Sequence, residues 1–478
     1  MKYSTLALVA QLVTSSSLIA TAWALVQREQ PKVLSLDIER RHVANPVQRD
    51  RLRRRQSSKT VQQTLDNLET LYFANASLGT PPQNLRLHID TGSSDLWANA
   101  GNSRLCSSRG SPCAESGTYT ANDSSTYSYV NSVFNISYVD GSGASGDYAK
   151  DTFRFGGRDI QNLQFGIGYS SSSPEGILGI GYTVNEVQVN RAGLQPYPNL
   201  PQKLTDDGTI SANAYSLWLN DLDASTGSIL FGGIDTSKFK GSLQLLPIIQ
   251  ERGVHAEFII ALTGMGQNGQ TNSIFTNQSI AVLLDSGSSL MYLPDNVANA
   301  LYEAYGAQYD SSQGAAFVDC NLSTRQGSIE FTFSGVTISV DLSELVITAG
   351  FQRGRPICIL GVSPAGNSLS VLGDTFLRSA YVVYDLQNNQ IGLAQTNFNA
   401  TGNSNIKEIT NGTAGVPSAT PVANAVSTAD VGQGGGRILG PTVSDSSAAA
   451  MPLITGSPWH AAGIAAAGAG VMLGFNGF

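Results

Sequence analysis

The sequence predicts an all-β protein built from two duplicated β lobes, related by a pseudo-twofold axis, with the functional site in the cleft between them. Three observations support this fold class. Short runs rich in Val, Ile, Thr, Tyr and Phe alternate with Gly, Ser and Asn, which is the pattern of strands and turns. Charged residues make up only 13% of the chain, and long helical stretches are nearly absent. One acid-containing turn occurs twice, and 478 residues are enough for two lobes.

Residues 1–24 are expected to be a signal peptide and not part of the fold. Lys2 gives a positive start, an apolar stretch follows, and Ala22-Trp23-Ala24 supplies small residues for cleavage. A transmembrane helix is the alternative interpretation, but Gln11 and the serines that follow it interrupt the apolar stretch. We therefore expect the chain to enter the secretory pathway.

Residues 25–55 form a basic segment that we interpret as a propeptide, cleaved after Arg55. The segment holds nine Lys/Arg and four Asp/Glu and ends in an arginine cluster. A solvated charge run or a nucleic-acid patch is the alternative. Removing its net +5, together with the +1 of Lys2, changes the net charge from −8 to −14. An acidic mature protein argues against nucleic acid as a partner.

The repeated turn carries an acid in each copy. Residues 85–99 read LRLHIDTGSSDLWAN, and residues 281–295 read AVLLDSGSSLMYLPD. An apolar run delivers Asp90 in the first copy and Asp285 in the second. A single Asp-(Ser/Thr)-Gly is ordinary turn chemistry, because Asp bonds its own backbone and Gly tolerates positive φ. Two copies with the same apolar lead-in point instead to a duplicated site.

A second motif repeats at a matching distance from the acids. Ile177-Leu178-Gly179 ends 89 residues after the first acid, and Val371-Leu372-Gly373 ends 88 residues after the second. Two halves that each contain both motifs imply a duplicated lobe. We expect the N-terminal lobe to span residues 56–245 and the C-terminal lobe to span residues 246–398.

A pseudo-twofold arrangement would bring Asp90 and Asp285 together where the lobes meet. Two carboxylates that close cannot both ionise cheaply, so the pair shares a proton and titrates as a unit. One acid then serves as base and the other as acid, and a water between them can be driven onto a carbonyl. The glycines allow close backbone approach, and the serine hydroxyls can hold the carboxylates. Thr91, Ser93 and Ser286 are the supporting residues, and Gly92, Gly287 and Ser288 are candidates for the substrate-binding surface.

From about residue 71 to 395 the chain resembles the pepsin-type aspartic endopeptidases. Residues 76–83, ASLGTPPQ, resemble the first-strand signature of that family, and residues 371–394 resemble its closing strands. The resemblance implies a bilobal pepsin-like fold with Asp90 and Asp285 as the catalytic pair. With a propeptide, a stalk and an apolar tail, the chain is most similar to the fungal, surface-anchored, yapsin-like members.

The same resemblance assigns a flap to residues 134–150, FNISYVDGSGASGDYAK. Tyr138 would be the flap tyrosine and would bond toward Trp97, although ordinary core packing is the alternative for both rings. Asp140 would lie at the cleft edge, followed by Gly141. In related fungal enzymes an acid at this position accompanies acceptance of Lys or Arg beside the scissile bond. The alternative is that Asp140 only stabilises the turn before Gly141.

Four cysteines in a secreted chain predict two disulfides. Their spacing favours Cys106–Cys113 and Cys320–Cys358, although three pairings are possible in principle. A metal site is the rival interpretation, but the cysteines are far apart and histidine is scarce. Seven sequons are glycosylation candidates. They are Asn75, Asn122, Asn135, Asn277, Asn321, Asn399 and Asn411.

The C-terminal end changes in composition after residue 398. Residues 399–447 are rich in Ser, Thr and Gly and lack strand-like runs, so we expect a disordered stalk. Residues 448–478 form an apolar tail with no Lys or Arg after it, which fits a GPI-anchor signal, with Ser447 as one candidate for the attachment residue. A membrane helix or a disordered Ala/Gly tail is the alternative.

We therefore predict an aspartic endopeptidase at the cell surface, attached to the plasma membrane or cell wall and acting at acidic pH on extracellular proteins and precursors. It should bind polypeptide substrates and pepstatin-type inhibitors, work as a monomer and require neither cofactor nor metal. A serine hydrolase is disfavoured because the body offers only His88 and His255 and lacks a Gly-x-Ser-x-Gly turn. A non-enzymatic peptide- or glycan-binding scaffold is the remaining alternative.

Overall fold

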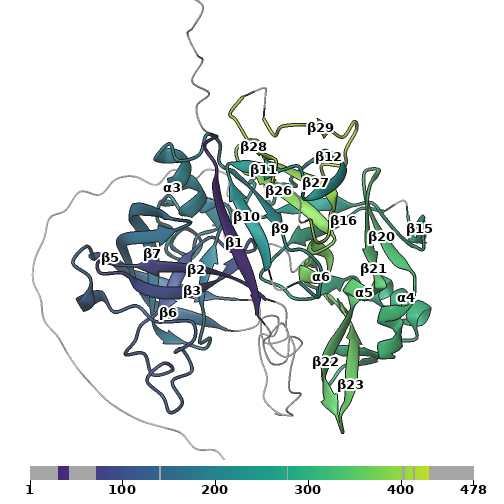
Figure 1. Ribbon diagram of the computed structural model, residues 1–478, viewed down its shortest axis with the longest axis horizontal. Helices are drawn as coiled ribbons and strands as arrows, with labels where there is room; N and C mark the ends of the chain where they lie inside the picture. Colours follow the sequence, from purple (N-terminus) through teal and green to yellow (C-terminus); the bar gives the residue numbers. More distant parts are fainter. Residues whose placement is uncertain are drawn as a thin grey trace, which may run out of the picture. The chain divides into compact units, whose positions relative to one another are not determined.

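The computed structural model describes residues 31–41, 71–138, 142–224, 226–276, 278–400, 404–412 and 415–429. Strands dominate this part of the chain (Figure 1), as the composition predicted. The predicted signal peptide, the region around Arg55, the pair Asp140–Gly141, Asn277 and the tail with Ser447 lie outside the described residues.

One sheet contains fourteen strands of the described chain, drawn from its beginning, middle and end. Their order is β29-β12-β27-β26-β9-β10-β1-β2-β3-β8-β4-β7-β6-β5. The strands are β1 (Leu34–Arg41), β2 (Leu71–Leu78), β3 (Gln83–Asp90), β4 (Leu96–Asn99), β5 (Ser128–Ser137), β6 (Gly143–Phe155), β7 (Arg158–Ser171), β8 (Gly176–Gly179), β9 (Ala214–Trp218), β10 (Thr226–Phe231), β12 (Phe239–Pro247), β26 (Ala380–Asp385), β27 (Gln390–Thr396) and β29 (Ala419–Pro421).

Three further sheets come from residues 259–372, in the part assigned to the second lobe. Their orders are β13-β16-β25-β17-β24, β15-β14-β20-β21 and β18-β19-β23-β22. The strands are β13 (Ile259–Leu262), β14 (Gly264–Gln267), β15 (Gln270–Phe275), β16 (Ile280–Leu284), β17 (Met291–Leu293), β18 (Gln308–Asp310), β19 (Ala315–Val318), β20 (Ser328–Phe333), β21 (Val336–Asp341), β22 (Val346–Gln352), β23 (Arg355–Leu360), β24 (Val362–Pro364) and β25 (Ser370–Leu372).

The helices of the described chain are short and connect strands. The helices α2 and α4 both end at a glycine in the left-handed conformation, Gly193 and Gly306. The helices are α2 (Val187–Ala192), α3 (Leu200–Asp206), α4 (Asp295–Tyr305), α5 (Leu342–Leu345) and α6 (Asp374–Leu377), with 3-10 turns at Ala121–Asp123, Thr183–Asn185 and Cys320–Thr324.

Strand β1, from the predicted propeptide, is built into the large sheet. It pairs antiparallel with β10 on one side and with β2 on the other (Figure 1). Ile38 is fully buried, and Glu39 forms an ion pair with Arg86 at 3.2 Å. We interpreted residues 25–55 as a basic propeptide from their charge and predicted no strand in them. The difference arises because Leu34, Leu36 and Ile38 alternate with polar residues, as a half-buried strand requires.

The large sheet also crosses the boundary that we expected between the lobes at 245/246. Strand β26 pairs antiparallel with β9, and β27 pairs with β12. Tyr384 of β26 stacks on Tyr215 of β9 with ring centroids 4.9 Å apart. The closing strands therefore share one sheet with strands from the first half.

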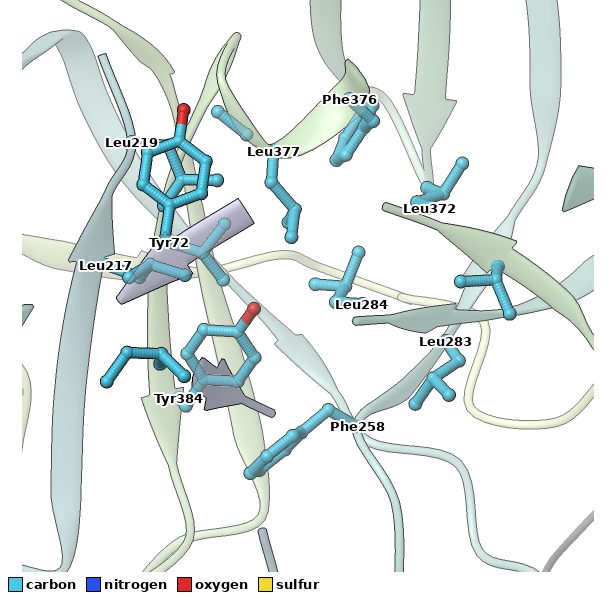
Figure 2. Close-up of a cluster of buried hydrophobic side chains, with 14 of the residues drawn as sticks. Tyr72, Leu217, Leu219, Phe258, Leu283, Leu284, Leu372, Phe376, Leu377 and Tyr384 are labelled. Atoms are coloured by element: carbon cyan, nitrogen blue, oxygen red, sulfur yellow. The ribbon is translucent and has the colours of Figure 1, made fainter. Parts of the chain in front are cut away.

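The largest hydrophobic cluster runs under both acid-bearing strands. Figure 2 shows part of it, where Leu284 of β16 lies between Leu377 of α6 and the ring of Tyr384, and Leu372 of β25 lies toward Phe376. This packing fixes the strand that carries the second acid. The labelled side chains are Tyr72, Leu217, Leu219, Phe258, Leu283, Leu284, Leu372, Phe376, Leu377 and Tyr384.

The expected stalk does not begin at residue 399 as a disordered segment. β28 (Ile406–Glu408) pairs with β11 (Gly233–Asp235), and β29 pairs parallel with β12. The physical reason lies in two apolar side chains, Ile409 and Val416, which are buried in a cluster with Trp218 and other residues. The prediction of a strand-free stalk is therefore wrong for the described residues between 404 and 429.

Candidate active site

The first acid lies at the end of β3, in a turn that binds its carboxylate. The backbone N–H of Gly92 donates to Asp90 Oδ1 at 2.8 Å. The hydroxyl of Ser93 donates to Asp90 Oδ2 at 2.5 Å. Asp90 is nearly fully buried. Both carboxylate oxygens are therefore held by their own turn.

The second acid repeats this geometry after β16. Gly287 N–H donates to Asp285 Oδ1 at 2.8 Å, and the Ser288 hydroxyl donates to Asp285 Oδ2 at 2.8 Å. Asp285 is also buried. The two turns thus have the same donor at the same carboxylate oxygen, as expected for duplicated halves.

The two turns are bound to each other by a reciprocal set of hydrogen bonds. Thr91 Oγ1 donates to the carbonyl of Leu284 at 2.9 Å, and Ser286 Oγ donates to the carbonyl of Ile89 at 3.0 Å. In addition, the backbone N–H of Thr91 donates to Ser286 Oγ at 3.2 Å, and the backbone N–H of Ser286 donates to Thr91 Oγ1 at 3.0 Å. The replacement of threonine by serine in the second turn therefore preserves every bond.

Each carboxylate lies close to the opposite turn across this junction. A Cβ on Gly92 would overlap the carboxylate of Asp285, and a Cβ on Gly287 would overlap the carboxylate of Asp90. Each acid therefore lies directly against the glycine of the opposite turn. A side chain at either glycine would have to displace a carboxylate.

The second repeated motif packs against each turn in the same way. β8 runs parallel to β3 with Gly179 opposite Asp90, and β25 runs parallel to β16. A Cβ on Gly179 would come within 2.6 Å of the Asp95 nitrogen, and one on Gly373 would overlap the Ser288 carbonyl. The glycines are thus needed for close backbone contact behind the acids.

The predicted flap is a hairpin of β5 and β6. Tyr138 is buried, and its hydroxyl accepts a hydrogen bond from Trp97 Nε1 at 2.7 Å. Its backbone N–H donates to the Ser142 carbonyl at 2.8 Å, which closes the hairpin across the tip. The structure therefore brings Tyr138 and Trp97 together.

The structure contains the two cysteine pairs that the spacing favours. Cys106 is bonded to Cys113 within one loop, and Cys320 is bonded to Cys358 of β23 across 38 residues. All four cysteines are used, which leaves no free thiol. The described residues contain no cluster of three His, Cys, Asp or Glu able to hold a metal.

Sequence reasoning missed a buried acidic cluster beside the first turn. The carboxylate of Asp95 accepts the hydroxyls of Tyr148 and Tyr197. Burial, opposed by these hydrogen bonds, raises the pKa of Asp95. Burial and the charge of Asp95 raise the pKa of Glu186 to about 10, so this carboxyl is neutral at physiological pH. One signal was present in the sequence, since the second turn has Leu290 where the first has Asp95.

The fold and the paired acid turns are those of a pepsin-like aspartic endopeptidase, and comparisons with known proteins agree. A family model of eukaryotic aspartyl proteases matches residues 71–396. The "Probable aspartic-type endopeptidase opsB" of Aspergillus oryzae is 55% identical over 429 residues, covering 88% of each chain. The "Secreted aspartic protease 4" of Candida albicans is 40% identical over 72% of this chain and 80% of its own.

The crystal structure of the aspartic proteinase from Irpex lacteus matches with a TM-score of 0.59 and 24% identity, covering 78% of this chain and all of the other. This likeness shows the pepsin-like fold. The chain belongs to the eukaryotic aspartyl protease family and is an aspartic-type endopeptidase that acts on polypeptide substrates. Its relatives include secreted aspartic proteases. Within the described residues, no helix is long and apolar enough to span a membrane.

Proposed function

We propose that Asp90 and Asp285 are the catalytic pair of a cell-surface endopeptidase that works at acidic pH. The reciprocal contact of each carboxylate with the opposite turn carries this proposal. Sharing one proton, the pair would deprotonate a water with one acid and polarise the substrate carbonyl with the other. Attack on the carbonyl carbon gives a tetrahedral intermediate, and return of the proton to the amide nitrogen releases the two peptide products.

The residues of the turns orient this pair. Ser93 and Ser288 hold Oδ2 of each acid and the glycine N–H groups hold Oδ1, so each carboxylate has a fixed orientation. Thr91 and Ser286 fix the relative position of the turns through buried hydrogen bonds. Fixed dipoles of this kind lower the reorganisation needed in the transition state.

The flap would close over the bound peptide and supply specificity. Tyr138, positioned by Trp97, would cover the cleft. Asp140 and Gly141 follow it, and we infer that the Asp140 carboxylate favours Lys or Arg beside the scissile bond. An exposed opposite-charge pair is worth about 1 kcal/mol, which corresponds to about a fivefold preference.

We also infer that the enzyme is made as a secreted precursor. Cleavage after Arg55 would release residues 25–55, and the burial of Ile38 in β1 supports a precursor in which this segment is part of the folded body. Self-cleavage and cleavage by another basic-site protease are both open routes, because Arg55 ends an arginine cluster.

The C-terminal tail would attach the enzyme to the plasma membrane or cell wall through a GPI anchor at Ser447, where a monomer would act on cell-wall proteins and precursors. The exposure of the described sequon asparagines supports glycosylation. Asn75, Asn122, Asn135, Asn321, Asn399 and Asn411 are all exposed. Release of the protein from intact cells by a GPI-specific phospholipase, and its loss in Ser447→Leu, would test the anchor.

Peptide cleavage by the processed, secreted chain ending at residue 447 tests the activity. Matched peptides with Lys, Arg or Phe before the scissile bond would be assayed from about pH 3 to 7, with and without pepstatin. We expect cleavage that pepstatin blocks and that Asp90→Asn and Asp285→Asn each abolish. Cleavage that survives either change would contradict the catalytic assignment. Absence of cleavage by the folded, processed protein would favour a binding scaffold.

The basic preference has its own matched control on the same hairpin. Asp140→Asn should lower kcat/KM for the Lys and Arg peptides about fivefold and leave the Phe peptide unchanged. Asp147→Asn removes the same charge from β6, where Asp147 accepts a hydrogen bond from exposed Ser132, and should leave all three peptides unchanged. Equal effects of the two variants would refute the role of Asp140.

A further inference from the structure

Asp95 is a buried carboxylate that the proposed cleavage chemistry does not use. Only 1% of Asp95 is exposed, and its carboxyl group accepts three hydrogen bonds within the protein. Tyr148 and Tyr197 donate their hydroxyls to Oδ1 at 2.5 and 2.9 Å, and the backbone N–H of Val187 donates to Oδ2 at 2.9 Å. A buried carboxyl group that accepts this many hydrogen bonds has a defined geometry.

The duplicated half shows that the turn itself does not require an acid here. Asp95 is the fifth residue after Asp90, and Leu290 is the fifth residue after Asp285. Leu290 is as fully buried as Asp95, and its turn keeps the same hydrogen bonds to the carboxylate. The acid at position 95 is therefore explained by contacts within its own half of the chain and not by the turn.

The three donors come from the elements that surround the flap hairpin. Tyr148 lies on β6, the returning strand of the hairpin. Val187 begins α2, and Tyr197 lies in the segment between α2 and α3. The carboxylate of Asp95 thus joins the catalytic turn to the flap strand and to the structure that supports it.

A continuous set of aromatic rings leads from Tyr148 to the flap tyrosine. Tyr148 makes edge contacts with Tyr197 and with Phe134 of β5, at centroid distances of 5.7 and 5.2 Å. Phe134 lies 6.3 Å from the ring of Trp97, and Trp97 donates to the Tyr138 hydroxyl. Both strands of the hairpin contribute a ring, so the position of Tyr148 affects the whole base of the flap.

We propose that Asp95 is a positioning residue for the flap: by fixing Tyr148 and Tyr197 it holds the aromatic set, and through Trp97 it holds Tyr138. This inference rests on the proposed function, because it assumes that the flap covers the substrate. Asp95 touches neither substrate nor the reacting atoms. Its loss should therefore weaken the binding of substrates and inhibitors more than it slows the chemical step.

The test compares Asp95→Leu, which installs the residue of the other half, with Asp95→Asn and Tyr148→Phe. We expect Asp95→Leu to raise KM and the pepstatin inhibition constant about tenfold while kcat changes less than threefold. Asn keeps an oxygen for the two tyrosine hydroxyls but places an N–H against that of Val187, so its effect should be intermediate. Tyr148→Phe removes one hydroxyl and should raise both constants about threefold.

Tyr119→Phe is the matched control. The Tyr119 hydroxyl donates to buried Asp151 of the same strand β6 at 2.6 Å, which is the same chemistry away from the aromatic set. It should lower the urea midpoint as much as Tyr148→Phe does, yet leave KM and the pepstatin constant within twofold. If Tyr119→Phe raised KM and the pepstatin constant as much as Tyr148→Phe, the role of Asp95 would be purely structural and the proposal would be overturned.

Hydrogen exchange separates this proposal from the proposed function. Asp95→Leu should speed amide exchange in β5 and the first half of β6, whereas Tyr119→Phe should affect only the end of β6. If Asp95→Leu does not fold, Asp95→Asn and Tyr148→Phe give the same comparison. Unchanged exchange and unchanged binding in these variants would overturn the positioning role. A wild-type chain that fails to cleave would overturn the proposed function, while exchange still decides the role of Asp95.

Discussion

Replacing Ser286 by alanine should destabilise the protein more than any ordinary serine change. The Ser286 hydroxyl donates to the Ile89 carbonyl and accepts the Thr91 N–H, and all three groups lie at the buried junction of the two acid turns. Alanine would leave one carbonyl and one N–H without partners where water has no access.

Each buried polar group left without a partner costs about 1–3 kcal/mol, so the two together should cost about 2–6 kcal/mol. That is a large share of the roughly 5–15 kcal/mol that stabilises a typical domain. The loss should appear as a lower urea midpoint at one acidic pH, with kcat reduced because the acids are no longer held in register. Thr91→Ala should cost nearly as much, because its hydroxyl makes the equivalent two bonds.

Two variants decide whether the hydroxyl is the cause. Ser286→Thr keeps the hydroxyl and reproduces the residue of the first turn, so its free energy of unfolding should stay within about 1 kcal/mol of that of the unmodified protein. Ser132→Ala removes an exposed serine hydroxyl and should change stability by less than about 0.5 kcal/mol. A Ser286→Ala protein as stable as Ser132→Ala would refute the reasoning from buried partners.

Three further predictions concern stability. Ile38→Ala should destabilise the unprocessed chain by about 2–5 kcal/mol in urea, because Ile38 is fully buried in β1; a loss below 1 kcal/mol would contradict the insertion of this strand. Replacing Cys320 and Cys358 by serine should cost about 4 kcal/mol, since the bond closes 38 residues, and an unchanged urea midpoint would be evidence against this loop-closure reasoning. Folded Glu186, whose pKa burial raises to about 10, keeps a proton that the unfolded chain releases above about pH 4.5, so stability falls as pH rises through this window. Glu186→Gln should flatten that fall between about pH 4.5 and 7, and parallel curves for the two proteins would contradict the assignment.

The duplication could be predicted because its signal is local. Asp90 and Asp285 each follow an apolar run and precede a Gly-Ser turn, so a short stretch of sequence identifies both. Gly179 and Gly373 gave a second repeated signal at a matching distance from the acids. In the structure each of these glycines packs against the acid-bearing turn of its own half.

The contacts that the sequence could not predict join distant segments. The three donors to Asp95 lie 53, 92 and 102 residues away, and no periodicity relates them. Strand β1 was missed for a different reason, because the high charge of residues 25–55 masked its alternation of apolar and polar residues. In the C-terminal segment, Ile409 and Val416 are too few to give a pattern, yet each is buried in the folded body.

The comparison of the two halves separates chemistry from substrate control. Asp90 and Asp285 each accept the N–H of the glycine and the hydroxyl of the serine in their own turn, so the two acids of the proposed catalytic pair are held in the same way. A peptide bond is not symmetric, and a symmetric pair alone has no preferred direction for it. The two halves differ at the fifth residue after each acid. The first half has Asp95, which binds two tyrosines, and the second half has the buried Leu290. On this reasoning, changes in the turns should act on kcat, and changes around Asp95 should act on KM and specificity, because Asp95 binds Tyr148 of the flap strand β6.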